Sequence, residues 1–260
     1  MDGVLLVYPM EAQELAMSTE QNARFYGELR PGVSDYWKWM AAPRFRLRTV
    51  IGILEKERPS SVIDLGCGGG ELLWEVKKRL GEVQLAGIDL SRELVEQNSR
   101  RMPWARFWVA DLGKRWDEAP TTGFDAVLAL EVIEHIESPE IFLRNAWDLG
   151  KRGTLLVLTT QSGKVHETER RVGHVRHYAQ SEMRELLAAT GWRAERIWNA
   201  GFPFHDLSKW IANLDPDRAM ERFGTRPYGA IEKGVAILLQ GLFRLNSNRR
   251  GAQLFVLARR

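Results

Sequence analysis

The sequence has 260 residues, of which 44% are hydrophobic and 27% are charged. This composition is sufficient for a packed core and argues against wholesale disorder, so we expect one large domain or one domain with an elaboration. The formal net charge of +3 is too small to indicate nucleic-acid binding by itself. The single cysteine, Cys67, excludes an internal disulfide and fits a reducing compartment.

The sequence contains no targeting or membrane-spanning segment that its pattern reveals. No apolar run reaches the roughly 18 residues that a transmembrane helix needs. The apolar stretch Gly3 to Tyr8 is short and follows Asp2 rather than a basic region, so it does not resemble a signal peptide. Met17 is a second candidate for the start of translation. We therefore expect a cytoplasmic protein.

Residues 1–58 form an aromatic segment ahead of the first predicted strand. Its apolar positions 47, 50, 51 and 54 follow helical spacing, and Pro43 suits the first turn of that helix. Two interpretations stay open, a helix packed on a sheet with aromatic residues as core filler or a lid that closes over a ligand. Tyr26, Tyr36 and Trp37 are its candidate substrate contacts.

A glycine-rich turn follows the strand-like run that starts at Val62. Gly66, Gly68, Gly69 and Gly70 then lead into a helical pattern at Glu71. Strand, turn and helix follow one another directly, so the unpaired backbone N–H groups of the helix start are available to a polar or anionic ligand. Glycine also permits positive φ and close approach of a ligand.

Strands and helices alternate from this turn onward. The next strands are expected at 83–89, 106–111, 124–130 and 154–160, with helices at 91–101, where Ser91 is the N-cap, and at 139–149. A helix over 181–190 ending at Gly191, a strand at 193–198 and a strand at 253–258 complete the pattern. This alternation predicts an α/β fold, a mostly parallel seven-stranded sheet of Rossmann-like type with helices on both faces.

Acidic residues stand at or near the ends of four successive strands. They are Asp64, Asp89, Asp111 and Glu131. Ligands of open α/β sheets bind at the carboxyl ends of the strands, so we expect these side chains to surround one site.

Residues 201–250 are an insertion that a minimal connection between two strands would not need. An apolar stripe at helical spacing runs through Ile231, Val235, Leu238, Leu239, Leu242 and Leu245. One interpretation packs this helix over the sheet or across a homodimer interface. The other is an interfacial helix near Arg244, Arg249 and Arg250 that admits an apolar or lipidic acceptor and contacts a membrane peripherally. The aromatic pocket residues predicted here are Phe202, Phe204 and Trp210.

The ligand of the glycine turn can be narrowed from its neighbours. Glu71 stands where a dinucleotide fingerprint has its third glycine, and no Gly-Lys-Ser/Thr of a phosphate loop follows. Asp89, roughly twenty residues after the glycines, suits a ribose diol, because one carboxylate accepts from both hydroxyl groups. Asp111, one strand further, suits an adenine amino group. An adenosine ligand without phosphates fits this set best.

These residues resemble the class I S-adenosylmethionine (SAM)-dependent methyltransferases, and most closely the branch of ubiquinone-biosynthesis O-methyltransferases and bacterial small-molecule methyltransferases. Residues 62–70, 87–89, 110–112 and 131–135 resemble four motifs of the family in register, and residues 173–178 resemble a segment of this branch. The resemblance covers residues 44–198 well and nearly vanishes in residues 201–250. It implies a seven-stranded fold whose last strand is antiparallel, with residues 1–58 as a helical lid, residues 59–200 and 251–260 as the SAM-binding domain, and residues 201–250 as the substrate-side insertion.

The resemblance also implies a role for each matching residue. The methionine portion of SAM would face Gly66, Cys67 and Gly68, and Arg46 would meet its carboxylate. The remaining expected cofactor contacts are Asp89 and Leu90 at the ribose, Asp111 and Leu112 at the adenine, and Glu131 near the sulfonium. For Asp64, a direct contact and a structural role in the turn stay open.

Methyl transfer to a hydroxyl requires an oriented nucleophile and removal of its proton. Histidine suits proton removal near neutral pH, and His135, His174 and His177 are the candidate catalytic residues, although loop packing explains them too. The predicted function is therefore SAM-dependent methylation of a small molecule, most readily at oxygen, with no metal and no nucleic-acid partner.

Two other interpretations stay open. Glu131, Glu134 and His135 with a later histidine are ligands that a divalent cation accepts, and a similar element holds a metal in small-RNA 2′-O-methyltransferases. A non-catalytic SAM-binding partner protein is the third interpretation. The absence of a strong basic stripe disfavours the RNA enzyme, and the intact cofactor residues disfavour the non-catalytic protein.

Overall fold

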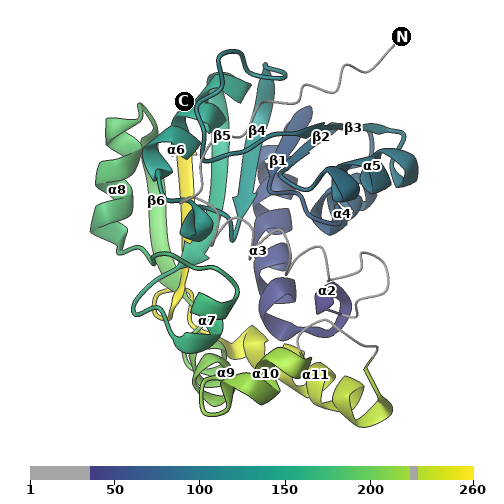
Figure 1. Cartoon of the computed structure of the whole chain (residues 1–260), viewed down its shortest axis with the longest axis vertical. Coiled ribbons are helices and arrows are strands. Elements are labelled where there is room, and N and C mark those ends of the chain that lie inside the picture. Colours follow the sequence, from purple (N-terminus) through teal and green to yellow (C-terminus); the bar gives the residue numbers. More distant parts are fainter. Residues whose placement is uncertain (1–35, 223–227) are drawn as a thin grey trace, which may run out of the picture.

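The computed structural model describes residues 36–222 and 228–260, which contain a seven-stranded sheet of order β3-β2-β1-β4-β5-β7-β6 (Figure 1). The strands are β1 (Ser61–Leu65), β2 (Gln84–Asp89), β3 (Ala105–Val109), β4 (Phe124–Leu130), β5 (Gly150–Gln161), β6 (Arg193–Ala200) and β7 (Gln253–Arg259). The first five strands pair in parallel, whereas β7 runs antiparallel to both β5 and β6. The predicted Rossmann-like α/β fold with an antiparallel last strand is confirmed.

Helices cover both faces of this sheet. One apolar cluster joins α3 (Ala41–Glu57) and α4 (Glu71–Leu80) to the sheet, and the other joins α6 (Pro139–Leu149) and α8 (Gln180–Ala189) to its opposite face. All five residues of β1 are buried, and three of them, Val62, Ile63 and Leu65, are apolar, as expected for a strand covered on both faces. The neighbouring residues Val62 and Ile63 point into different clusters, as the twofold period of a strand requires.

The remaining short elements lie between these units. They are α2 (Tyr36–Trp39), α5 (Arg92–Arg101), the 3₁₀ turn η1 (Ile133–His135) and α7 (Glu167–Arg171). The predicted third strand ends at Val109, so Asp111 lies two residues beyond it, and the fifth strand is longer than expected. The sequence pattern did not predict α7, because its charged residues carry no apolar period.

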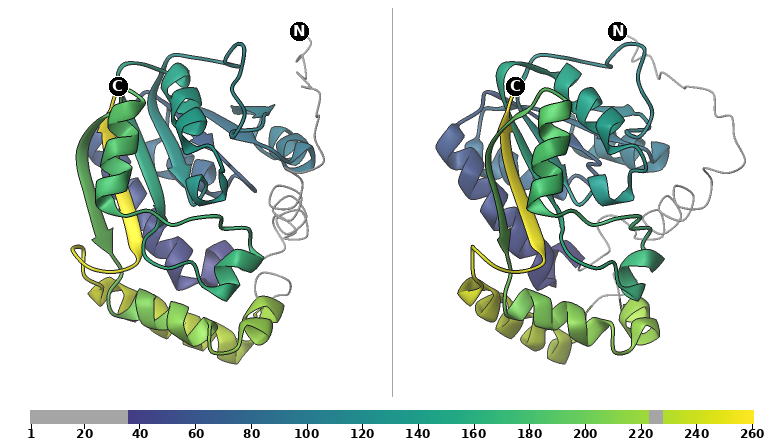
Figure 2. Two further views of the ribbon diagram at one scale, coloured as in Figure 1. Left: turned by 60° about the vertical axis from the view of Figure 1, so that its left-hand side comes forward. Right: turned by 90° about the vertical axis from the view of Figure 1, so that its left-hand side faces the viewer.

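The insertion contributes α9 (Phe204–Ala212), α10 (Pro216–Arg222), α11 (Ala230–Leu242) and the 3₁₀ turn η2 (Phe243–Leu245). These helices form a layer at one end of the molecule, below the tips of β4 and β5 in Figure 1, and Figure 2 shows the same layer from two other sides. The insertion therefore lies at the edge of the sheet where the parallel strands end.

The apolar stripe of α11 does not pack over the sheet. Ile231 is 83% exposed, Leu238 63% and Leu245 70%, whereas the buried residues of this segment are Ala236 and Phe243. The helix instead contacts α2 and α3 through its other side, and Gln240 donates a hydrogen bond to the Trp39 carbonyl oxygen. The expectation of a sheet-packed stripe is therefore wrong for these exposed positions. No helix within residues 36–222 and 228–260 combines the length and apolarity needed to cross a membrane.

The N-cap of α5 allows a first test of the fold. The Ser91 hydroxyl oxygen accepts a hydrogen bond from the Leu94 N–H at 3.3 Å, as the sequence predicts. Ser91→Ala should lower the free energy of unfolding by about 1 kcal/mol, because it leaves this helix N–H without its partner. Ser99→Ala in the same helix is the control, because Ser99 bonds only the Val95 carbonyl oxygen of the preceding turn. Urea denaturation of both variants measures the difference, and equal stabilities would contradict the assignment.

Candidate functional site

The glycine turn connects β1 to α4 and is tied to β2. Its Gly66, Gly68 and Gly70 all have positive φ, and a Cβ atom on Gly66 would lie 2.6 Å from the Val132 side chain. The Gly66 and Cys67 N–H groups both donate to the Ile88 carbonyl oxygen, at 2.8 and 3.0 Å. This geometry explains why glycine is needed at position 66.

Asp89 lies at the end of β2 directly beside this turn. Its carboxylate accepts hydrogen bonds from the Gly68 N–H at 2.8 Å and from the Ser91 N–H at 2.9 Å. Burial raises the pKa of Asp89, while these two N–H groups oppose that shift. Among the described residues, a Cβ atom on Gly68 would meet no other atom within 4 Å, so space is open on that side of the turn.

Asn98, on α5, is a site residue that sequence reasoning missed. Its amide nitrogen donates to the Gly68 carbonyl oxygen at 2.7 Å, and the side chain is fully buried. It thereby fixes the conformation of the turn from the opposite side. A buried asparagine on an otherwise amphipathic helix is the signal that points to it.

Asp64 and Cys67 lie beneath the turn. Both are buried, and burial followed by the nearby Asp89 charge raises the pKa of each side chain. The Cys67 sulfur packs so closely on Gly87 that a Cβ atom there would lie 2.7 Å away. Cys67 is therefore a packing residue of the turn.

The residues expected near the adenine lie beyond β2 and β3. The Asp111 carboxylate accepts a hydrogen bond from the Gly113 N–H at 2.9 Å, and the Trp116 ring N–H donates to the Asp111 carbonyl oxygen at 3.0 Å. Leu112 is buried, whereas Leu90 is exposed. Asp111 and Leu90 thus border the site from the β2 and β3 side, as their strand positions predict.

Glu131, immediately after β4, holds an ionised carboxylate inside the protein. Arg46 approaches it at 3.7 Å, and Gln161, Gln253 and Thr159 donate hydrogen bonds to it at 2.6, 2.8 and 2.9 Å. Burial alone would raise the pKa of Glu131, but Arg46 and these donors lower it to about 2. Its φ of 57° is unusual for a residue with a side chain, which indicates that the surrounding contacts impose it.

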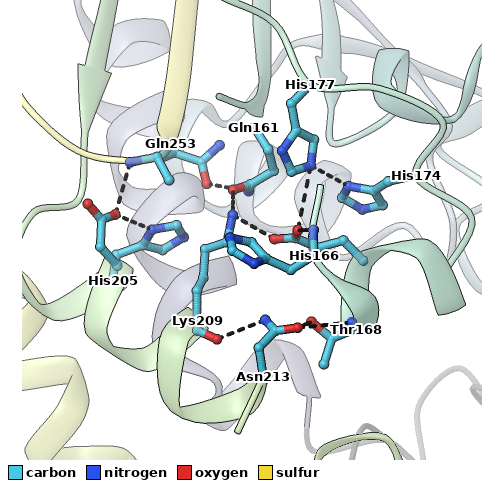
Figure 3. Close-up of polar contacts among 12 residues, drawn as sticks. Gln161, His166, Thr168, His174, His177, His205, Lys209, Asn213 and Gln253 are labelled. Atoms are coloured by element: carbon cyan, nitrogen blue, oxygen red, sulfur yellow. Dashed lines mark hydrogen bonds and ion pairs between the residues drawn. The ribbon is translucent and has the colours of Figure 1, made fainter. Parts of the chain in front are cut away.

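Gln161 and Gln253 come together because β5 and β7 pair antiparallel. They are partners in the strand register, and Gln161 donates to the Gln253 amide oxygen at 3.1 Å, as Figure 3 shows. The sequence analysis predicted both strands but not these two residues. Their positions at the last residue of one strand and the first of the other are the signal that could have identified them.

His135, His174 and His177 gather beside Glu131. The His135 and His174 rings stack edge to face at 4.7 Å, and His174 Nδ1 lies 3.1 Å from His177 Nε2. Burial, and then the adjacent His135, lowers the pKa of His174 to about 2, and burial lowers that of His135 to about 4. The His135 and His174 rings are therefore neutral at pH 7, which is the form of imidazole that binds a metal ion or takes up a proton.

Glu134 lies in the same cluster and is fully buried. Thr160 donates to its carboxylate at 2.8 Å, and burial followed by the Glu131 charge raises its pKa well above the usual range. Ligand atoms of Glu134, His135 and His174 lie within 4.8 Å of one another. This spacing can hold a divalent cation, and it contains Glu134, His135 and a later histidine of the alternative metal interpretation, but not Glu131.

The predicted aromatic contacts are not all available for comparison. Tyr26 lies outside the described residues, and of Tyr36 and Trp37, at the start of α2, only the backbone is described. Phe202 and Trp210 are 51% and 60% exposed, and Phe204 is half-buried at the start of α9. Their contact with a substrate stays a prediction.

Residues 36–197 match the family model of the methyltransferase domain. The chain belongs to this family. The resemblance to class I SAM-dependent methyltransferases is therefore confirmed. The matched range contains every predicted cofactor residue and ends at β6, before the insertion.

Among proteins of known name, a ubiquinone biosynthesis O-methyltransferase of Maricaulis maris is 36% identical over 116 residues, which cover 41% of this chain and 44% of that protein. One of Xanthomonas campestris pv. campestris is 39% identical over 106 residues, covering 38% and 42%. The chain thus matches less than half the length of these relatives.

Among solved structures, a phosphoethanolamine N-methyltransferase 2 of Haemonchus contortus in complex with SAM has a TM-score of 0.56 and 14% identity. That alignment covers 91% of this chain and 60% of the other. At this identity the likeness concerns the fold.

SAM is the cofactor of this family, and the site fits it. Asp89 ends β2 beside the turn, and a Cβ atom on Gly68 would meet no atom of the described residues within 4 Å, so the turn leaves room for a ligand to approach its backbone. The turn supplies no basic residue for a pyrophosphate, which agrees with an adenosine ligand that carries none. When bound, SAM supplies an activated methyl group, and the chain has to orient the acceptor and manage its proton.

Asp89 gives a direct test of this site. Asp89→Asn should weaken the binding of S-adenosylhomocysteine about ten- to a hundred-fold, because hydrogen bonds from the ribose to a charged acceptor are stronger than those to an amide. Isothermal titration calorimetry measures the dissociation constant. Glu93→Gln, an exposed acid in the first turn of α5, is the control. Unchanged binding by Asp89→Asn would contradict the ribose contact.

Proposed function

We propose that this protein transfers the methyl group of SAM to a hydroxyl group of a small molecule. The observation that carries this proposal is the cluster of three histidines beside Glu131, at the carboxyl edge of the sheet where Asp89 also ends β2. The names of the similar relatives, which are O-methyltransferases, support oxygen as the acceptor atom. We further propose that the protein acts in the cytoplasm.

In the proposed reaction, the acceptor oxygen attacks the methyl carbon in line with the departing thioether, and the hydroxyl proton passes to a histidine. His174 is the proposed general base. A proton taken up by its ring is shared with His177, which is 3.1 Å away and faces the Glu169 carboxylate at 3.9 Å. The carboxylates of Glu131 and Glu169 favour the protonated state, which offsets part of the burial penalty on the ring.

The acceptor is proposed to be apolar outside its reacting hydroxyl. The insertion exposes apolar side chains on α9 and α11, among them Trp210, Ile231 and Leu238. Exposed arginines at positions 244, 249 and 250 follow this face, which suits an acceptor delivered from an anionic lipid surface.

His174→Gln tests this function. SAM turnover with a panel of phenols, with and without alkyl tails, should identify an acceptor for the wild type. His174→Gln should lower kcat for that acceptor about a hundred-fold or more, because general-base catalysis typically contributes 10²–10⁴. Liquid chromatography with mass detection of S-adenosylhomocysteine and of the methylated product measures both reactions.

Two controls make this test specific. His166→Gln changes an exposed histidine, and it should retain wild-type kcat, because the His166 backbone N–H that bonds Glu169 is unchanged. Leu238→Ser on the exposed face of α11 should raise KM for a long-tailed phenol and leave that for a short one unchanged. A wild-type protein that binds SAM but methylates no acceptor would favour the non-catalytic interpretation.

The spacing of Glu134, His135 and His174 favours a second candidate, metal-dependent 2′-O-methylation of RNA. In that case the cation would need the Glu134 carboxyl to lose its proton on binding, and the neutral imidazoles would bind it without losing one.

Removal of divalent ions separates the two candidates. Treatment with EDTA followed by dialysis should leave methylation of the small-molecule acceptor within about twofold, because a histidine base needs no ion. Activity that disappears with EDTA and returns with Mg²⁺ or Mn²⁺ would overturn the metal-free mechanism. Elemental analysis of the purified protein provides an independent readout.

A further inference from the structure

Lys209, on insertion helix α9, reaches into the polar network around the histidines. Its ammonium group lies 2.6 Å from a Glu169 carboxylate oxygen and 2.9 Å from the Gln161 amide oxygen, as Figure 3 shows for Gln161. The Lys209 and Glu169 side chains are only 17% and 11% exposed. A pair this buried loses much of its hydration, so its contribution to stability is small, and a role in fixing geometry becomes the better explanation.

Glu169 stands between Lys209 and the histidine pair. One carboxylate oxygen bonds Lys209, whereas the other accepts the His166 N–H at 2.7 Å and lies 3.9 Å from His177 Nε2. A separation of 3.9 Å is too long for a hydrogen bond. The same His177 nitrogen lies 3.1 Å from His174 Nδ1. His177 Nε2 therefore contacts the His174 ring, whereas the Glu169 carboxylate lies beyond hydrogen-bond distance of the same nitrogen.

His174 and Glu169 are two alternative hydrogen-bond partners for the same nitrogen of His177. His177 Nε2 can face either the neutral His174 ring or the charged Glu169 carboxylate, and a carboxylate is ordinarily the stronger partner. Lys209 removes that advantage, because its charge holds the carboxylate and satisfies one of its oxygens. Gln161 fixes the lysine in turn and also donates to Glu131, so the lysine is connected to both ends of the site.

We propose that Lys209 is a positioning residue that holds Glu169 away from His177 and so keeps the His174–His177 pair aligned for proton removal. The expected effect of Lys209 on kcat rests on the proposed methyl transfer. Its expected effect on the orientation of the histidine rings rests on the geometry alone. Through this lysine, the insertion that borders the acceptor side also sets the orientation of the histidines.

Other contacts keep α7 in place when Lys209 is changed. Asn213 accepts hydrogen bonds from the Thr168 N–H and hydroxyl at 3.1 Å each, and Arg171 pairs with Asp217 at 2.6 Å (Figure 3 shows the first pair). The Arg171–Asp217 pair joins the same two parts of the chain as Lys209–Glu169 but is exposed and makes no histidine contact. Asp217→Asn is therefore a matched control.

The structural consequence is read from the histidine rings by long-range ¹⁵N–¹H NMR. The protein has 5 histidines, so each ring can be assigned with single His→Gln variants. In Lys209→Met, the ring-nitrogen signals of His174 and His177 should shift toward a changed or averaged tautomer, while those of His166 stay. Lys209→Arg and Asp217→Asn should keep the wild-type pattern. Lys209→Gln is the second variant, since it retains polarity without charge and should reproduce the shift.

The kinetic consequence is a fall in kcat of about ten- to a hundred-fold in Lys209→Met, the loss expected when a catalytic group is misplaced. The KM for SAM should stay within about twofold, and Lys209→Arg should restore kcat. Histidine spectra of Lys209→Met and Lys209→Gln that match the wild type would overturn the proposal. Because the spectra need no acceptor, they decide it even if the proposed methyl transfer fails.

Discussion

The candidate site depends on one buried charge. Glu131 is ionised at the end of β4, and an ionised carboxylate away from water is tolerated only when it is paired and fully hydrogen-bonded. Its four partners come from three separate elements: Arg46 on α3, Thr159 and Gln161 on β5, and Gln253 on β7. Each of these elements must arrive at the carboxyl edge in a fixed position, so the charge couples the local geometry of the site to the order of the sheet.

That requirement gives the antiparallel last strand a chemical consequence. If β7 ran parallel to β5, its first residue would lie at the far edge of the sheet. Running antiparallel, it places Gln253 directly opposite Gln161, and the two amides share Glu131. The insertion directly precedes this strand in the chain. It is also bonded to the start of the strand, because Asp206 on α9 accepts a hydrogen bond from the Ala252 N–H at 2.9 Å. The site, the last strand and the insertion are therefore mechanically connected, although only the first of them lies in the range that matches the family.

The sequence predicted what repeating patterns and short motifs determine. Alternating apolar runs predicted the strands, and Ser91 and Gly191 correctly marked a helix start and a helix end. The glycine turn and Asp89 were placed together because both stand at strand ends. The Glu169–Lys209 pair lies outside the reach of such reasoning, because its partners are 40 positions apart on two short helices whose packing no local pattern encodes. The exposed stripe of α11 shows a second limit of sequence reasoning. Apolar residues at helical spacing predict a helix, but they do not predict which surface packs against it.

The insertion has two chemically different sides, and their difference suggests how acceptor binding and catalysis are related. Toward the sheet, α9 presents Lys209 and the buried His205 to a polar network, while α9 and α11 expose apolar residues elsewhere. An apolar acceptor that bound to the exposed side of α9 would contact the helix whose Lys209 pairs with Glu169. Displacement of α9 by even a small distance would lengthen the 2.6 Å contact of Lys209 and release the carboxylate toward His177. Under the proposed role of Lys209, the alignment of the histidine pair would depend on the position of the insertion, so acceptor binding and proton removal would be coupled through α9.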